Sequence, residues 1–240
     1  MLTVAYDGTG FFGWQSQARG RTVQGELERA LGELFKAPTP CTGASRTDSG
    51  VHALGQRAVF SAETTIPTEK IPPALYPYLP PDISVRDAIA VPEDFNPRFM
   101  AREKTYEYRI LNSRTRNPLL RNYTEYVPEP LDLDKMRRAA EAFPGEHDFK
   151  GFCSAKTSAK TTLRTIYEMD VFRSGEEIIL RVKGNAFLYN MVRIIAGTLI
   201  YAGLGKIDPG EMEEILLSGD RERAGKTAGP RGLCLMEIKF

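Results

Sequence analysis

The sequence predicts an α+β fold built on a largely antiparallel sheet. Three observations support this class: strand-like and helix-like segments are mixed along the chain, they follow no regular strand–helix–strand order, and one pair of strands is joined as a hairpin. The 240 residues, 42% of them hydrophobic, suffice for one large domain or for two fused halves.

The first hundred residues are expected to contain three strands and one well-defined helix. The helix begins at Val23 after a capping Thr22, carries apolar residues at helical spacing, and is stopped by Pro38. Six prolines in residues 67–82 restrict any helix there to a short one near Pro72. The expected strands span residues 2–6, 58–62 and 83–91.

The rest of the chain is expected to mix strands and helices in the same irregular way. In residues 104–111, Tyr106, Tyr108 and Ile110 alternate with polar residues, which indicates a strand with an aromatic face. The other expected elements are a helix capped by Asp132 or Asp134, a hairpin of residues 165–172 and 178–182 without a tight two-residue loop, an apolar helix of residues 187–202, a helix opened by Asp208, and a strand of residues 233–240. A division into halves near Met100 is possible, because each half would hold a strand, a helix and further strands.

Composition argues against several classes of protein. Cys41, Cys153 and Cys234 are odd in number and form no CxxC pair, so neither a disulfide framework nor a structural zinc site is expected, and a reducing cytoplasmic location fits best. The first residues do not read as a signal peptide. The most apolar run, which starts at Ile194, is shorter than the roughly 20 residues that a membrane span needs.

Positive charge is concentrated in two stretches although the net charge is only +1. The first contains Arg98, Arg102, Lys104, Arg109, Arg114 and Arg116 against Glu103 and Glu107, and the second contains Lys150, Lys156, Lys160 and Arg164 with no acid between them. A single run of this kind is usually a solvated face. Two such stretches with interleaved aromatic residues favour an anionic polymer as partner, and Arg98, Lys104, Lys156 and Lys160 are the candidate contacts to it.

The stretch CTGASRTDSGVHALGQ, residues 41–56, is the strongest candidate for a functional site. As a bare tripeptide, Asp48-Ser49-Gly50 would be an ordinary Asx-turn. Arg46 changes that interpretation, because residues two apart in an extended segment project to the same side, and a carboxylate beside a guanidinium stays ionised. The glycines at positions 43, 50 and 55 are expected to let a large ligand approach the backbone.

Other catalytic chemistries lack the residues that they require. His52 and His147 are the only histidines, and no second carboxylate lies near Asp48 in the sequence, so a metal site or a two-carboxylate glycosidase is not expected. The sequence contains no GxSxG, HExxH or Walker A motif. What remains is one ionised aspartate with a basic partner, acting without a metal or a cofactor.

Together with this loop, several further segments resemble the TruA family of tRNA pseudouridine synthases. They are YDGTGFFGWQ with TVQGELERAL, DFNPRF, KTYEYRI and NAFLYNMVRIIAGTL, and the resemblance runs from Leu2 to Phe240. The loop departs from the usual GRTDAGVHA at Ser45 and Ser49, which replace Gly and Ala. Both replacements are small, so the loop shape and the activity are expected to persist.

The resemblance implies a fold and an activity. The fold would consist of two similar α/β halves of the RRM or ferredoxin-like kind, residues 1–100 and 101–240, with a continuous, mainly antiparallel sheet and a basic cleft between them. The activity would be the isomerisation of uridine to pseudouridine at positions 38, 39 and 40 of tRNA by a homodimer. The base would have to be flipped out of the RNA, and no cofactor is needed because the product is an isomer.

The resemblance also implies roles for individual residues. Asp48 would be the catalytic aspartate, Arg193 its basic partner, and Arg46 a flanking residue, while Tyr106 would lie against the target base. By position alone, however, Tyr106 is expected to be a core aromatic. Arg193 lies in an apolar helix and would need a carboxylate if buried.

Three further residues are expected to be structural. His52 is expected to be a turn residue, and Trp14 and Phe11 are expected to lie in the core. The alternative to the enzyme is a non-catalytic RNA-binding protein with an RRM-like sheet, although no RNP1-type aromatic string is present. A metal-dependent nuclease fails because too few ligands are available.

Overall fold

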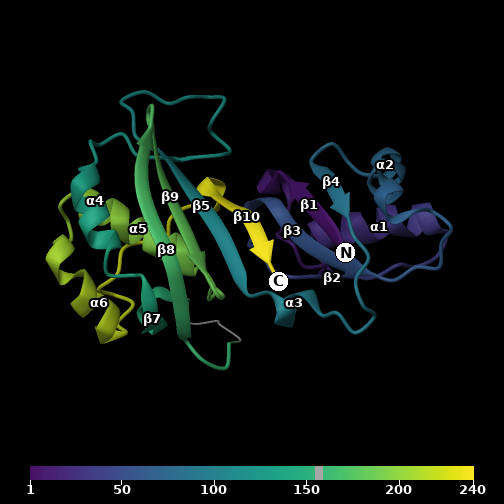
Figure 1. Cartoon of the computed structure of the whole chain (residues 1–240). Coiled ribbons are helices and arrows are strands. Elements are labelled where there is room, and N and C mark those ends of the chain that lie inside the picture. The colour runs from purple at the N-terminus through teal and green to yellow at the C-terminus, as the bar shows by residue number, and fades with distance from the viewer. Residues whose placement is uncertain (155–158) are drawn as a thin grey trace. The chain divides into compact units, whose positions relative to one another are not determined.

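The computed structural model describes residues 1–154 and 159–240. The chain divides into two compact units, which are described separately (Figure 1). Unit 1 consists of Met1–Arg102 and Cys234–Phe240, and unit 2 of Glu103–Leu233. Unit 1 is therefore built from both ends of the chain.

The sheet of unit 1 has the strand order β4-β1-β3-β10, with β2 paired to β3. Its strands are β1 (Leu2–Tyr6), β2 (Cys41–Gly43), β3 (His52–Phe60), β4 (Ile83–Ala88) and β10 (Leu233–Lys239). β1 runs antiparallel to both β3 and β4, β2 runs antiparallel to β3, and only β10 runs parallel to β3. β1 is thus held on both sides within the sheet.

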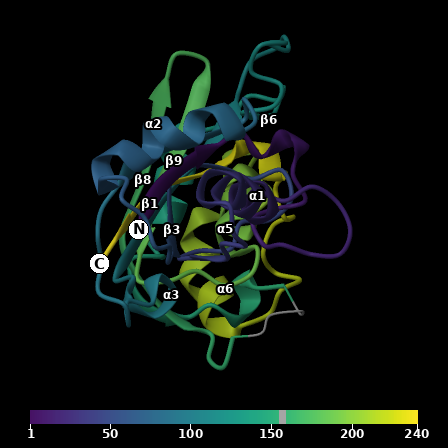
Figure 2. The same cartoon turned by 90° about the vertical axis from the view of Figure 1, so that its right-hand side faces the viewer.

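The helices of unit 1 are α1 (Val23–Phe35), α2 (Ile71–Leu75) and α3 (Pro97–Met100). As expected, α1 begins after Thr22, whose side chain accepts a hydrogen bond from the Gly25 amide. It ends at Lys36, in the left-handed conformation at φ 58°, ahead of Pro38. α1 packs against α2 and β2, and Figure 2 shows α1 and α2 on this unit.

The sheet of unit 2 has the strand order β5-β9-β8-β7. Its strands are β5 (Glu103–Leu111), β6 (Glu125–Tyr126), β7 (Gly145–Asp148), β8 (Leu163–Ser174) and β9 (Glu177–Gly184), and only β6 pairs in parallel, with β5. The expected class, α+β with mainly antiparallel pairing, is confirmed.

The β8–β9 hairpin corrects one expectation. Ser174 pairs with Glu177, so the loop consists of only two residues, Gly175 and Glu176. The prediction that this loop is not of the tight two-residue type was wrong. Gly175 adopts φ +60°, the left-handed conformation that such a turn requires.

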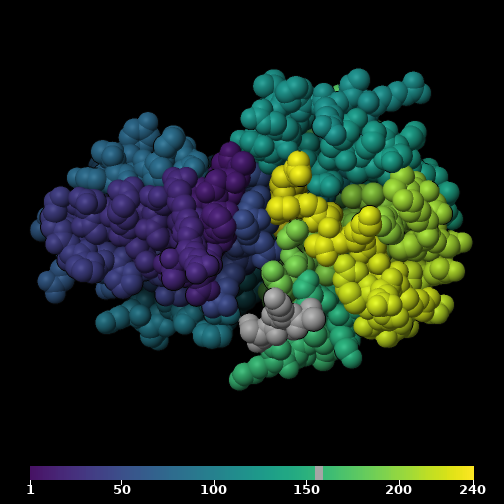
Figure 3. Space-filling model, turned by 180° about the vertical axis from the view of Figure 1, so that it is seen from behind, coloured from purple at the N-terminus to yellow at the C-terminus, as the bar shows by residue number. Residues whose placement is uncertain are grey.

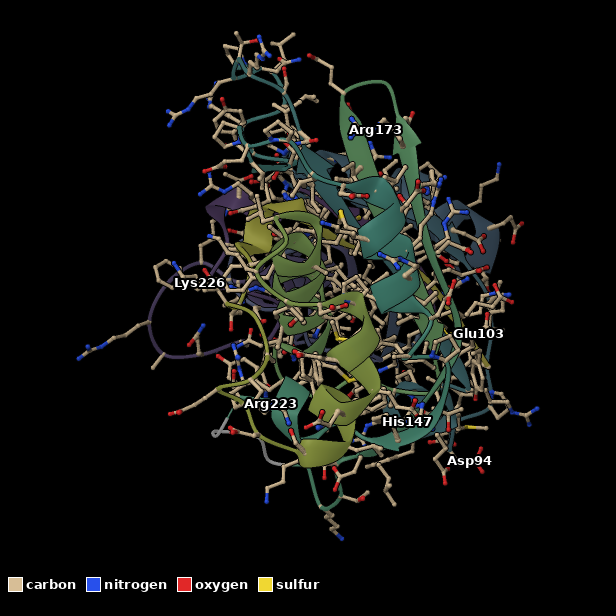
Figure 4. All side chains as sticks on the ribbon, turned by 90° about the vertical axis from the view of Figure 1, so that its left-hand side faces the viewer. Asp94, Glu103, His147, Arg173, Arg223 and Lys226 are labelled. Carbon is tan, nitrogen blue, oxygen red and sulfur yellow. The ribbon has the colours of Figure 1, made fainter. Side chains whose placement is uncertain are left out.

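The helices of unit 2 lie on one side of its sheet (Figures 1 and 4). They are α4 (Leu133–Ala140), α5 (Met191–Gly203) and α6 (Met212–Ser218). The Asp132 carboxylate caps α4 by accepting from two backbone amides, and Asp208 caps the 3₁₀ turn that leads into α6. α5 begins later than expected, at Met191, because Asn190 in front of it has a left-handed backbone.

Four short elements were not expected, and β3 begins several residues earlier than expected. The sequence pattern missed β2, β6, β7 and α3, which have two to four residues each and so show little periodicity. β3 begins at His52 rather than Ala58. His52 is therefore a buried strand residue, and its assignment to a turn was wrong. Among the described residues, no helix combines the length and the apolar character needed to cross a membrane.

Candidate active site

The candidate site in unit 1 is loop 44–51, which connects β2 to β3. The loop is fixed at its start by Gln56, a fully buried residue of β3. The Gln56 side-chain amide donates to the Ser45 carbonyl at 2.6 Å, and its oxygen accepts from the Ser45 amide at 3.2 Å. The Ala44 amide donates to the Arg57 carbonyl. The backbone therefore enters the loop along a defined path.

Thr47 is the buried residue at the centre of the loop. Its hydroxyl shares a hydrogen bond with the Tyr6 hydroxyl at 2.7 Å, and its carbonyl accepts from the Trp14 amide at 3.0 Å. On either side of it, Arg46 is exposed and Asp48 is half-buried. This alternation fits an extended backbone in which Arg46 and Asp48 project to the side opposite Thr47.

The end of the loop is a turn that is bonded to Phe11. The Val51 amide donates to the Asp48 carbonyl at 3.1 Å and closes the turn. The Ser49 hydroxyl donates to the Phe11 carbonyl at 3.1 Å, and the Gly50 amide donates to the same carbonyl at 3.3 Å. Ser49, one of the two departures from the family pattern, therefore adds a hydrogen bond that an alanine could not make.

Segment 8–14 is the structural partner of this loop. It belongs to the part of the chain that precedes α1. This part is coloured purple at the surface of unit 1 in Figure 3. Gly13 has φ +91°, and a Cβ there would lie 2.6 Å from the Thr47 carbonyl oxygen. A Cβ on Gly8 would collide with the Val51 carbonyl. Segment 8–14 and loop 44–51 lie so close together that only glycine fits at positions 8 and 13.

The glycines within residues 41–56 serve the same internal packing. A Cβ on Gly43 would collide with the ring of Trp14, and one on Gly55 with the backbone of Met236. Gly50 adopts φ +78° in the turn. The expectation that these glycines make room for a ligand is therefore wrong at positions 43 and 55, because protein atoms occupy that space. Phe11 and Trp14 are both buried, as expected.

Arg98 places a second positive charge near Arg46. It lies in α3, which packs against β2 and β3 and is capped by Asn96. Partial burial and the charge of Arg98 both lower the pKa of the Arg46 guanidinium. Both side chains are exposed, and neither forms a hydrogen bond or ion pair with any other residue that the structure describes. Two unneutralised guanidinium groups make this surface suitable for an anion such as a phosphate.

The remaining candidate residues belong to unit 2. Tyr106 lies on β5, is 6% exposed, and packs edge-to-face on Phe187 with ring centroids 5.2 Å apart. Arg193, in the first turn of α5, is half-buried; it donates to the Ala228 carbonyl at 2.9 Å and to the Asn190 side-chain oxygen at 2.7 Å. The arginine side chain is therefore held in one position.

Ala228 belongs to the segment that follows α6. Arg223 of this segment lies beside α6 and donates to Glu214 at 2.8 Å, and Lys226 is exposed (Figure 4). The Ala228 amide in turn donates to the Arg193 carbonyl, so the segment and α5 are bonded in both directions. Nothing in the sequence pattern indicated that Ala228 would form these hydrogen bonds with Arg193.

The basic residues of unit 2 differ in how much of their charge is neutralised. Arg109 lies 3.6 Å from the carboxylates of both Glu107 and Glu177, so it is part of an ion-pair network rather than an open basic face. Lys104 is half-buried on β5 and Lys160 is exposed. Lys156 lies outside the described residues.

The family of the chain follows from its sequence relatives. The pattern of the family described as tRNA pseudouridine synthase matches residues 2–100 and 139–240. The chain belongs to this family. It is 49% identical to the tRNA pseudouridine synthase A of Caldicellulosiruptor bescii over 100% of this chain and 98% of that protein, and 45% identical to that of Bacillus licheniformis over 99% and 97%.

Solved structures add little to this assignment. A chain from the crystal structure of a Cbf5-Nop10-Gar1 complex is 11% identical, with a TM-score of 0.38 over 99% of this chain and 58% of that one. A likeness this weak supports no conclusion. Family membership nevertheless decides between the two function classes, because the chain is a tRNA pseudouridine synthase, an isomerase, rather than a non-catalytic RNA-binding protein.

Proposed function

We propose that this synthase isomerises uridine at positions 38, 39 and 40 of the tRNA anticodon arm, with Asp48 as the carboxylate that acts on the substrate. In the reaction the N1–C1′ bond breaks, the uracil turns, and a C5–C1′ bond forms. The proton on C5 is lost, and N1 gains a proton. Substrate and product are isomers, so the protein must supply only positioning, charge and a proton acceptor.

The geometry of loop 44–51 is the observation that supports this role for Asp48 best. Thr47 is buried and anchored, whereas Asp48 beside it is half-buried. In an extended backbone, neighbouring side chains project to opposite sides, so Asp48 is expected to project away from the Thr47 anchor. A carboxylate held on a rigid backbone can meet a reacting atom without a large loss of conformational freedom. The fit between segment 8–14 and the loop provides that rigidity.

Arg46 and Arg98 are proposed to hold phosphates of the RNA beside the target nucleotide. Their charges are not neutralised by other described residues, and guanidinium groups bind phosphate in a bidentate manner. Lys104, Lys160 and Lys156 are retained as further candidate contacts to the RNA. Lysine at such contacts acts as a point charge and contributes to affinity more than to specificity.

Arg193 and Tyr106 are proposed to complete the site. Arg193 would pair with the Asp48 carboxylate and keep it ionised, and its hydrogen bonds to Asn190 and Ala228 support a fixed guanidinium. Tyr106 would place its ring against the flipped base. Both roles are supported by the family resemblance.

The family resemblance also supports a homodimer. Sedimentation of the purified protein tests this proposal, and a measured mass equal to that of a single chain would overturn it.

The deciding experiment uses tRNA that carries 5-tritiated uridine, with enzyme in excess over RNA. Single turnover removes product release from the comparison. Wild-type protein is expected to release tritium and to form pseudouridine at positions 38–40 when the modified tRNA is mapped. Asp48→Asn should bind tRNA and melt like wild type but release no tritium.

Asp134→Asn is the matched control, because it removes one carboxylate charge from an exposed residue of α4 whose side chain is 86% exposed. It should react at the wild-type rate. Pseudouridine formed by a wild-type-free Asp48→Asn preparation would refute the assignment of Asp48. Modification only at other positions of the tRNA would refute the proposed target.

A further inference from the structure

Tyr6 and Thr47 form a buried hydroxyl pair directly behind the proposed catalytic aspartate. Their side-chain oxygens are 2.7 Å apart although the residues are 41 positions apart in the sequence. Tyr6 is 5% exposed and Thr47 is 8% exposed. Each hydroxyl therefore finds a hydrogen-bond partner in the other where little water can reach.

Tyr6 is a rigid support for this bond. It is the last residue of β1, and its Cα is paired with Ala53 of β3 on one side and Ile83 of β4 on the other. Its ring also lies against Trp14, with centroids 6.1 Å apart. A tyrosine held by two neighbouring strands can transmit the position of the sheet to the loop.

Thr47 is held at a second point by segment 8–14. Its carbonyl accepts from the Trp14 amide at 3.0 Å, and Gly13 lies directly against that carbonyl. As a β-branched residue, threonine also has few side-chain rotamers. Two anchors on one residue fix both its position and its rotation about the chain, and the neighbouring side chains, Arg46 and Asp48, then project in one direction.

We propose that Thr47 is a positioning residue, whose hydrogen bond to Tyr6 sets the direction in which Asp48 meets the substrate. The inference rests on the proposed role of Asp48. It assigns no chemistry to the two hydroxyls, because they lie on the buried side of the loop. A purely structural pair would contribute to stability without affecting turnover, so the two possibilities differ in a measurable way.

The test compares Tyr6→Phe, Thr47→Val and the double variant in steady-state and single-turnover assays on tRNA. A carboxylate displaced by a fraction of an ångström is expected to lower kcat roughly 10- to 100-fold. The KM for tRNA should change less than about twofold, because the phosphate contacts remain. The double variant should be no slower than the slower single variant, because both changes remove the same bond. Thr47→Ser keeps the hydroxyl and should restore most of kcat.

Thr124→Val is the matched control in unit 2. Thr124 is 2% exposed, and its hydroxyl donates to the Leu120 carbonyl at 3.0 Å. This variant should lose melting temperature to a similar degree as Thr47→Val while kcat stays unchanged. Thr47→Val and Tyr6→Phe with wild-type kcat, beside an inactive Asp48→Asn, would overturn this inference alone. An active Asp48→Asn would overturn the proposed function and this inference with it.

Discussion

Loop 44–51 and strand β5 both carry residues of the proposed site, but they hold them by different means. β5 pairs with β9 through a continuous register from Lys104 to Leu111, so its backbone is held by repeated hydrogen bonds that do not depend on side-chain identity. The loop has no such pairing. It is held by single contacts from Tyr6, Phe11, Trp14 and Gln56.

This difference predicts how each region responds to substitution. A strand with many equivalent hydrogen bonds tolerates the loss of one side chain's polar group, because the backbone pairing remains. A loop held by individual contacts is sensitive to any one of them. Substitutions that remove a contact anchoring the loop should therefore affect both stability and turnover, whereas those on β5 should affect only the function of the side chain itself.

The largest expected effect is that of Gly13→Ala, compared with Gly175→Ala in the β8–β9 turn. Both glycines have positive φ, which costs an alanine about 1–2 kcal/mol. At Gly175 nothing lies within 4 Å of the new Cβ, whereas at Gly13 the Thr47 carbonyl oxygen lies 2.6 Å away. Gly13→Ala should therefore lose ~3 kcal/mol or more of unfolding free energy and most of the activity. Equal denaturation midpoints for the two variants would contradict the close contact between segment 8–14 and loop 44–51.

The second prediction concerns Tyr106 on β5. Tyr106→Phe keeps the ring and its edge-to-face packing on Phe187, so the melting temperature should change little. If the hydroxyl helps to remove the C5 proton of the base, kcat should fall on the order of 100-fold. tRNA binding, measured by filter retention, should be unchanged. If Tyr106→Phe turned over at the wild-type rate, the hydroxyl would have no role in catalysis, and Tyr106 would be a core aromatic only.

The third prediction concerns Arg98, which lies outside both regions but next to Arg46. Arg98→Gln should weaken tRNA binding several-fold. It should also reduce the magnitude of the slope of log affinity against log salt concentration by roughly 0.7–0.9, because one phosphate contact is lost. Arg109→Gln is the control, because Arg109 already interacts with Glu107 and Glu177. An unchanged slope for Arg98→Gln would show that Arg98 does not contact a phosphate of the RNA.

The smallest expected effect concerns Glu26, which supports segment 8–14 indirectly. Arg21 lies over the Phe11 ring at 4.3 Å and is bonded to Glu26 and Asp82. Burial opposes ionisation of Glu26, but hydrogen bonds from Arg21 and Arg29 outweigh it and lower the pKa of the carboxyl. A lowered folded-state pKa stabilises the fold above the unfolded-state pKa, and this stabilisation is lost as the pH falls.

Glu26→Gln should therefore be less stable than wild type near neutral pH by about 1 kcal/mol or less, because the ion pairs are partly exposed. The difference should shrink as the pH falls below about 4.3, the ordinary pKa of a glutamate in an unfolded chain, and should disappear below the lowered pKa of the folded protein. Urea denaturation at several pH values measures it. A stability difference that grows on acidification would contradict the lowered pKa.

The sequence by itself determined the elements whose signals are local. Alternation predicted β5, apolar spacing and Thr22 predicted α1, and the spacing of Arg46 and Asp48 marked the loop of the candidate site. These patterns arise from the periodicity of one chain segment and from its caps, so they can be found without knowing what lies nearby.

Only the tertiary structure decided which distant segments meet. It showed that Gly43 and Gly55 make room for Trp14 and for the backbone of Met236 rather than for a ligand, and that Thr47 is anchored by Tyr6. It also showed that Arg109 is neutralised by two glutamates. The physical reason is the same in each case: a glycine or a hydroxyl has no fixed role until another part of the chain, tens of residues away, packs against it.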